Sequence, residues 1–203
     1  TSFIRVGSNP TGTSLRYFEG GIDDLKIWNK ALSFEEVRRL AEVEDKIETE
    51  LIGHWPFDGN TNDYSVLKND GSANGGLIYG KDRHGNDSSV IELDGINDNV
   101  SIPHFSEFNR DTLSISMWIK PTASELLEDR GLQYRIQTLF FKGASTSRAN
   151  TTFSISLHQK DDEDNIRLRS YASTSTTGFG FDKDTLNTTN DNWYNVVLVL
   201  EGT

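Results

Sequence analysis

The amino-acid sequence predicts an all-β protein, a two-sheet antiparallel sandwich with one short helix near residues 33–45. Two observations support this fold class. Short segments that alternate apolar and polar residues recur along the chain, as they do in the strands of a sandwich. Hydrophobic residues make up only 34% of the chain and glycine occurs 17 times, a balance that suits strands joined by long polar loops.

The N-terminal part of the chain predicts two strands and the helix. Residues 3–7 and 17–28 have the patterning of strands. Ser33 followed by Glu36 forms a capping box, a pattern with which helices begin. We therefore expect a helix from Ser33, with one apolar face made of Phe34, Val37 and Leu40.

Nearly every patterned segment after residue 50 predicts a strand. Residues 193–200 are apolar on both faces, which predicts a central strand buried on both sides. Residues 173–178 are rich in Ser and Thr and predict a loop. One further strand is expected to begin at Leu51. The others are expected at residues 90–93, 100–102, 113–119, 138–142, 153–157 and 166–169.

Charge and composition exclude several kinds of partner and site. The formal net charge of −11 repels phosphate backbones, so we expect neither nucleic acid nor anionic membrane as a partner. The same charge suits a divalent cation. The chain has no cysteine, which excludes disulfides and thiolate chemistry. It contains no apolar run of ~20 residues, so we expect no membrane insertion. It has no starting Met and no signal peptide, so we expect it to be a segment of a longer protein.

Several motifs resemble one known family. Residues 55–59 (Trp-Pro-Phe-Asp-Gly), 93–103 (Leu-Asp-Gly-Ile-Asn-Asp-Asn-Val-Ser-Ile-Pro) and 112–121 (Thr-Leu-Ser-Ile-Ser-Met-Trp-Ile-Lys-Pro) occur in the order found in that family, followed by residues 193–197 (Trp-Tyr-Asn-Val-Val). These segments, with residues 20–24 (Gly-Gly-Ile-Asp-Asp), resemble the laminin-G-like branch of the concanavalin A-like jelly rolls. The resemblance implies an all-β jelly-roll sandwich.

The order of the motifs departs from the family at the two chain ends. The Gly-Gly-Ile-Asp-Asp strand closes the domain in the family but comes first here, and about two strands of hairpin are absent after residue 203. Residues 1–50 are therefore either the closing strands and helix of the same sandwich, in permuted order, or the tail of a preceding repeat. Residues 51–203 form the main body. Because a tail of this size could not bury its own core, we favour the single sandwich.

An oxygen-rich loop is the best candidate for a metal site. Residues 58–65 concentrate Asp and Asn side chains around Gly59, and calcium prefers such oxygen ligands. The resemblance implies that this loop lies against residues 22–24 and holds a structural calcium ion. The alternative is a polar turn whose side chains bond their own backbone. The candidate ligands are Asp23, Asp24, Asp58, Asn60, Asn62 and Asp63.

The sequence also contains an incomplete catalytic motif and several candidate ligand contacts. Glucanases of this fold use a Glu-x-Asp-x-x-Glu strand, but Asn97 stands at the third position after Glu92 and Asp94, so the carboxylate set is incomplete. The resemblance implies core positions for Trp55 and Trp118. Loop aromatics and nearby arginines are better candidates for ligand contacts, and these are Tyr171, Phe179, Phe181, Arg167 and Arg169.

These observations predict a non-catalytic binding or adhesion module, extracellular or on the cell surface, that recognises a glycan or a cell-surface or matrix protein. The module carries a structural calcium ion in this hypothesis. One alternative is an accessory or degenerate domain of a glycoside hydrolase. Another is a structural repeat of a surface filament or stalk, with strands exchanged between neighbouring copies.

Overall fold

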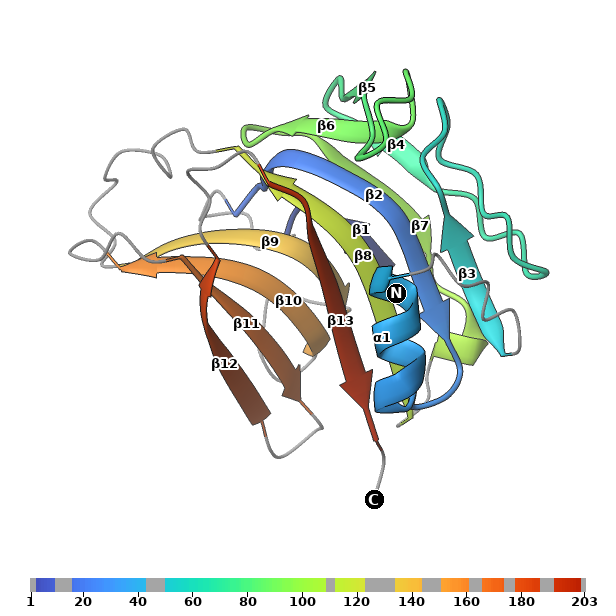
Figure 1. Ribbon diagram of the computed structural model, residues 1–203, viewed down its shortest axis with the longest axis vertical. Helices are drawn as coiled ribbons and strands as arrows, with labels where there is room; N and C mark the ends of the chain where they lie inside the picture. Colours follow the sequence, from blue (N-terminus) through green and yellow to red (C-terminus); the bar gives the residue numbers. More distant parts are fainter. Residues whose placement is uncertain are drawn as a thin grey trace.

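The computed structural model describes residues 3–9, 16–42, 50–108, 112–122, 134–143, 151–160, 166–173, 178–186 and 192–201. These residues form two antiparallel β-sheets packed face to face, with one α-helix on the outside (Figure 1). The all-β sandwich that the sequence predicts is thereby confirmed. Among the described residues, no helix is long and apolar enough to cross a bilayer.

Sheet A contains seven strands in the order β12-β11-β10-β9-β1-β7-β4. All of its neighbouring strands are antiparallel. Its members are β12 (Gly178–Leu186), β11 (Ile166–Ser173), β10 (Thr151–Lys160), β9 (Tyr134–Gly143), β1 (Phe3–Val6), β7 (Asn99–Pro103) and β4 (Ser72–Asn74).

Sheet B contains six strands. Five follow the order β13-β8-β2-β6-β5, and β3 pairs with β2 beside β6. Its members are β13 (Tyr194–Leu200), β8 (Leu113–Pro121), β2 (Glu19–Trp28), β6 (Val90–Asp94), β5 (Ile78–Gly80) and β3 (Leu51–Trp55).

The N-terminal strands lie inside the two sheets rather than beside them. β1 is hydrogen-bonded to β9 on one side and to β7 on the other, and β2 lies between β8 and the pair β6 and β3 (Figure 1). Residues 3–9 and 16–42 and the described segments from residue 50 onward therefore share one sandwich. This is the folded-back arrangement of the two that the sequence left open.

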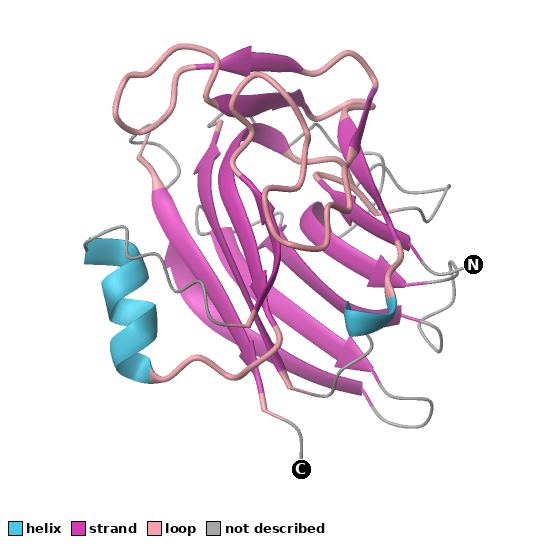
Figure 2. Cartoon of the chain, turned by 90° about the vertical axis from the view of Figure 1, so that its right-hand side faces the viewer, coloured by secondary structure: helices cyan, strands magenta, loops and turns pink. Residues whose placement is uncertain are grey.

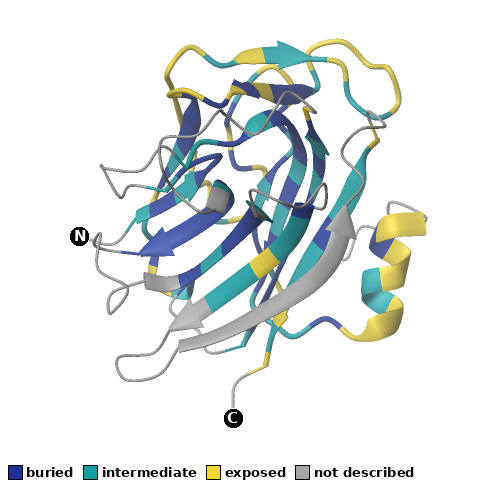
Figure 3. Cartoon of the chain, turned by 90° about the vertical axis from the view of Figure 1, so that its left-hand side faces the viewer, coloured by how far each residue is buried: buried dark blue, intermediate teal, exposed yellow. Residues whose placement is uncertain are grey.

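The core fills the space between the sheets with alternate residues of their strands (Figure 3). Trp55 and Phe57 are fully buried there, as are Phe140 and Phe153, whose rings stack 5.6 Å apart. One charged group also lies in this core. The Lys142 side chain is 1% exposed, its ammonium group donates a hydrogen bond to the main-chain oxygen of Phe108 at 2.7 Å, and burial lowers its pKa to about 8.

The helix α1 (Phe34–Glu42) covers one end of the outer face of sheet B (Figure 2). Its capping box forms as expected, because the Glu36 carboxylate accepts the main-chain N–H of Ser33 at 2.8 Å. Leu40 is buried against Trp28 of β2 in a small second cluster. The expectation that Phe34 joins the apolar face was wrong. This residue opens the first turn and is 79% exposed.

Three local expectations differ from the structure. β13 is an edge strand of sheet B, not a central one. Residues 178–186 form β12, where only a loop was expected from residue 173 to 178, and the short strands β4 and β5 were not expected. These differences depend on which strands become neighbours, a non-local property.

Candidate functional site

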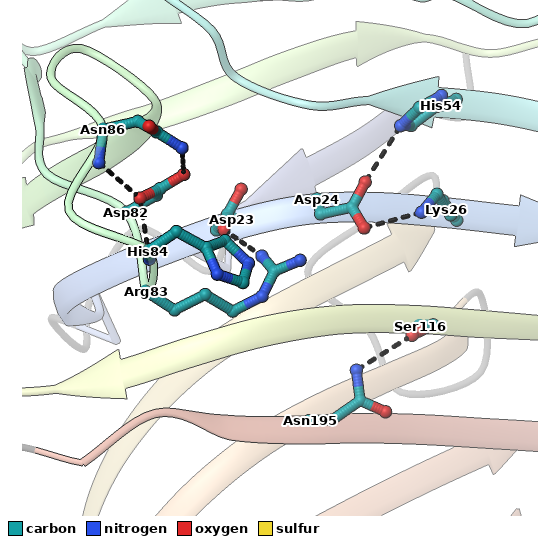
Figure 4. A network of polar contacts seen from close by, with 10 residues as sticks. All are labelled: Asp23, Asp24, Lys26, His54, Asp82, Arg83, His84, Asn86, Ser116 and Asn195. Atoms are coloured by element: carbon teal, nitrogen blue, oxygen red, sulfur yellow. Dashed lines mark hydrogen bonds and ion pairs between the residues drawn. The ribbon is translucent and has the colours of Figure 1, made fainter. Parts of the chain in front are cut away.

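The first candidate surface is a polar network on the outer face of sheet B, centred on two adjacent carboxylates of β2 (Figure 4). The pairing of β2 with β8 shifts register between Asp23 and Lys26, and Asp24 has a positive φ of 50°. Such a bulge inserts one extra residue into a strand. Because Ile22 before it and Leu25 after it are both buried in the core, the bulge holds both carboxylates outside the core.

Asp23 is paired with an arginine from a distant loop. The Arg83 guanidinium, between β5 and β6, forms an ion pair with the Asp23 carboxylate and lies 4.8 Å from the ring centroid of Trp118. Asp23 is 4% exposed. Burial raises the pKa of Asp23 to about 7; the Arg83 charge opposes this rise, and the Asp24 carboxylate adds to it.

Asp24 is paired with two different groups. Its carboxylate lies 2.6 Å from the Lys26 ammonium and 2.9 Å from Nε2 of His54, which belongs to β3. Burial alone would raise the pKa of Asp24, but the hydrogen bonds with His54 and Lys26 outweigh it and hold the pKa at about 2. Two neighbouring carboxylates of one strand thus differ widely in acidity because their partners differ.

The loop after β3 is organised by the carboxylate of Asp63, which is 1% exposed. It accepts main-chain N–H groups from His54 at 2.9 Å, Ser65 at 2.8 Å and Asn69 at 2.8 Å, and the Ser65 hydroxyl at 2.9 Å. Four donors therefore saturate its two oxygens. His54 links this loop to β2, since its main chain binds Asp63 and its ring binds Asp24.

The other expected metal ligands in this loop bond the backbone nearby. The Asn60 amide donates to the main-chain oxygen of Asp58 at 2.8 Å, and the Asn60 side-chain oxygen accepts the N–H of Asn62 at 2.9 Å. Asp58 and Asn62 are exposed. This is the pattern of a polar turn.

The six expected calcium ligands do not combine into one oxygen cage in this arrangement. Asp23 and Asp24 are held by cationic groups, and Asp63 is held by four N–H and O–H donors. Within the described part of the chain, no three His, Cys, Asp or Glu residues gather as a metal site. The residues as placed here therefore do not fit the calcium ion that the resemblance implies, and the ion itself stays a prediction.

The turn that resembles a degenerate glucanase strand is also internally bonded. One oxygen of Asp94 accepts the main-chain N–H groups of Ile96 at 2.8 Å, Asn97 at 3.2 Å and Asp98 at 3.3 Å. Glu92 is exposed on β6. The Asp94 carboxylate therefore acts as the cap of a turn.

The second candidate surface lies on the outer face of sheet A. In β10 the alternate residues Phe153, Ile155 and Leu157 are buried in the core, so the intervening residues face outward. Register then places the outward residues of β10 beside three of the predicted ligand contacts on β11. The pairs are Ser154 with Tyr171, Ser156 with Arg169, and His158 with Arg167.

This row is joined by short polar contacts. The Ser156 hydroxyl lies 2.9 Å from Nε2 of His158, and the Arg169 guanidinium lies 3.4 Å from Nδ1 of the same ring. Arg169 is exposed, while Arg167 and Tyr171 are partly exposed. The row presents the Ser154 hydroxyl with imidazole, guanidinium and phenol groups on one sheet face, while Ser156 beneath them is buried.

The two phenylalanines predicted to join this surface belong to β12. Register pairs Phe179 with Ala172 and Phe181 with Ser170. Because successive strand residues alternate between the two faces, these two positions belong to the opposite face of the sheet from Arg169 and Tyr171. Their description as loop aromatics was wrong. Sequence reasoning missed the strand because two glycines and two aspartates interrupt the apolar pattern in residues 178–184.

The two tryptophans expected in the core have different environments. Trp55 is fully buried, as the resemblance implies. Trp118 instead lies on the outer face of sheet B beneath Arg83 and is partly exposed, because its neighbours Met117 and Ile119 occupy the core side of β8. The alternation of β8 in the sequence carried this signal.

Comparison with known proteins gave no match to a family model, to a curated protein or to a solved structure, so the laminin-G-like resemblance remains a prediction that rests on the motifs themselves.

Proposed function

We propose that this protein is a non-catalytic, extracellular binding module whose ligand is a glycan held on the outer face of sheet A. The observation that carries the proposal is the row formed by β10 and β11. Ser154, His158, Arg167 and Arg169 supply hydrogen-bonding groups beside Tyr171, and the buried Ser156 hydroxyl contacts the His158 ring. Sugar hydroxyls need several such groups at fixed positions, and an aromatic ring supplies an apolar face.

The state of the carboxylates supports binding rather than hydrolysis. Glycoside hydrolysis requires two carboxyl groups facing the scissile bond. Asp94 and Asp63 are instead bound by main-chain N–H groups, and Asp23 by Arg83. An accessory or degenerate domain of a glycoside hydrolase remains the alternative, and it shares the same ligand class.

A glycan array with the purified protein tests the proposal, followed by titration calorimetry with the sugars that bind. The variants Tyr171→Ala and Arg169→Ala should each weaken affinity about tenfold, which corresponds to roughly 1.4 kcal/mol. Matched controls are Tyr64→Ala and Arg38→Ala, which remove an exposed tyrosine and an exposed arginine elsewhere. Equal losses in the controls, or no glycan bound at all, would contradict the proposal.

Recognition of a protein is the second candidate. The same row of arginine and tyrosine side chains is of a kind enriched at protein interfaces. Binding to deglycosylated cell-surface or matrix proteins, lost in Arg169→Ala but kept in Arg38→Ala, would favour it over glycan recognition.

A further inference from the structure

The edge strand β13 lacks the features that protect other strand edges in this protein. An exposed edge offers unpaired N–H and C=O groups, and natural sheets defend it with charges, prolines, bulges or short length. β13 is seven residues long, contains no charged residue and no proline, and pairs with β8 without a register shift. No described strand pairs with its other side (Figure 1).

Every other outer strand edge has such a protection. β4 and β5 are three residues long. β12 contains Asp182, Lys183 and Asp184, and its pairing with β11 shifts register. The free side of β3 is closed by its own loop, because His54 bonds Asp63 through its N–H and Tyr64 through its main-chain oxygen. β13 is therefore the exception among the described strand edges.

The side chains of β13 also leave apolar surface uncovered. Val196 is buried, but Tyr194, Leu198 and Leu200 pack against the core while remaining only partly buried. On the outer face Val199 is 37% exposed. The sequence of this strand has the two-sided apolar pattern of a central strand, although it lies at an edge. A further strand on its free side would remove this mismatch.

We propose that β13 pairs with β13 of a second copy of this chain, antiparallel about Val197, so that sheet B continues through both copies. This register sets Val197 opposite its own counterpart, Val196 opposite Leu198, and Tyr194 opposite Leu200. The core-facing apolar residues of each copy then meet those of the other. The proposal goes beyond ligand recognition and does not depend on it.

Charge supports a second copy as the occupant. The chain has a net charge of −11, so most approaches between two copies bring like charges together. β13 has no charge, and the antiparallel register sets an uncharged strand against an uncharged strand. One strand seam buries less than the roughly 1,200–2,000 Å² of a stable interface. We therefore expect a reversible dimer with a dissociation constant that is roughly micromolar.

Sedimentation velocity from micromolar to millimolar protein tests for this dimer. Val197→Lys places two ammonium groups at the two-fold axis and should abolish association, whereas the control Val66→Lys makes the same change at an 86% exposed loop residue and should not. A mixture of Val197→Lys with Val197→Glu should restore association. A monomeric wild type, or a dimer that Val197→Lys leaves intact, overturns the proposal.

A cross-linking experiment identifies the partner strand and its register. The chain has no cysteine, so Val197→Cys introduces a single thiol. Residues directly opposite in an antiparallel pair lie within disulfide distance. Val197→Cys should form a linked dimer on mild oxidation, while Asn195→Cys, whose proposed partner is Val199, should not. This variant decides the matter if Val197→Lys fails to fold. Absence of the Val197 link, or attachment of a different polypeptide at β13, overturns the proposal.

Discussion

Nε2 of His54 lies 2.9 Å from a carboxylate oxygen of Asp24. This contact joins β3 to β2 through residues that are thirty positions apart in the sequence. The main chain of His54 is bonded in turn to Asp63. One residue of β3 therefore connects β2 with the loop after β3. In the structure, hydrogen bonds of His54 make this connection.

The loss of folding stability at acidic pH should depend on Asp24. Its pKa of about 2 lies below the ordinary value of 3.8, so the carboxylate stabilises the fold above pH 4 and loses this contribution as pH falls from about 4 to 2. Asp24→Asn should lower the free energy of unfolding by about 2 kcal/mol at pH 7 and flatten its decrease in acid. Urea unfolding at a series of pH values measures this. An equal effect of the exposed control Asp58→Asn would refute it.

The contribution of Asp23 to folding stability should change with pH in the opposite direction. The pKa of Asp23 is raised to about 7, so the folded state binds a proton more readily than the unfolded state between about pH 4 and 7. The contribution of this group to stability should therefore decrease as pH rises through that window. The difference in unfolding free energy between wild type and Asp23→Asn should show this slope. An NMR titration of Asp23 with a midpoint below 4 would mean that Arg83 outweighs burial.

Lys142 should make stability rise in alkaline solution. Burial lowers its pKa from 10.5 to about 8, so between these values the unfolded state holds a proton that the folded state has released. The unfolding free energy of wild type should then increase relative to Lys142→Met as pH rises from 8 to 10.5. The control Lys81→Met removes an exposed ammonium group and should give no such slope. A flat difference for Lys142→Met would contradict the prediction.

Calcium should have little effect on thermal stability. A calcium ion at residues 58–63 would have to displace the N–H groups that already bind Asp63. We therefore expect the melting temperature in excess calcium and in chelator to agree within about 2 °C, because substantial binding to the folded state alone would raise it by mass action. Differential scanning fluorimetry measures both. A calcium-dependent rise that is lost in Asp63→Asn would restore the metal site implied by the sequence.

Local signals made much of the fold predictable. The capping box at Ser33 and Glu36 lies within one turn of helix, and the alternation of β8 determines which residues face the core. Pairing is not local. The ion pair of Arg83 with Asp23 joins residues that are 60 positions apart, and nothing in either segment specifies the other.

The edge position of β13 is likewise not predictable from its local sequence. Its apolar residues predict burial on both faces, but whether neighbours supply that burial depends on the rest of the sheet. The row on β10 and β11 was predicted only in part. Arg167, Arg169 and Tyr171 were proposed as ligand contacts from their residue types. Ser156 and His158 were not, because only the register places them beside these residues.

The interior position of β1 and β2 affects how the protein can be synthesised. β1 is synthesised before the other described strands, yet its register partners on β9 extend from Phe140 to Gly143. Translation must therefore pass residue 143 before sheet A can close around its first strand. Folding that waits for such distant partners is slow compared with helical domains. Until then the two early strands keep unpaired edges, which are prone to associate with other chains.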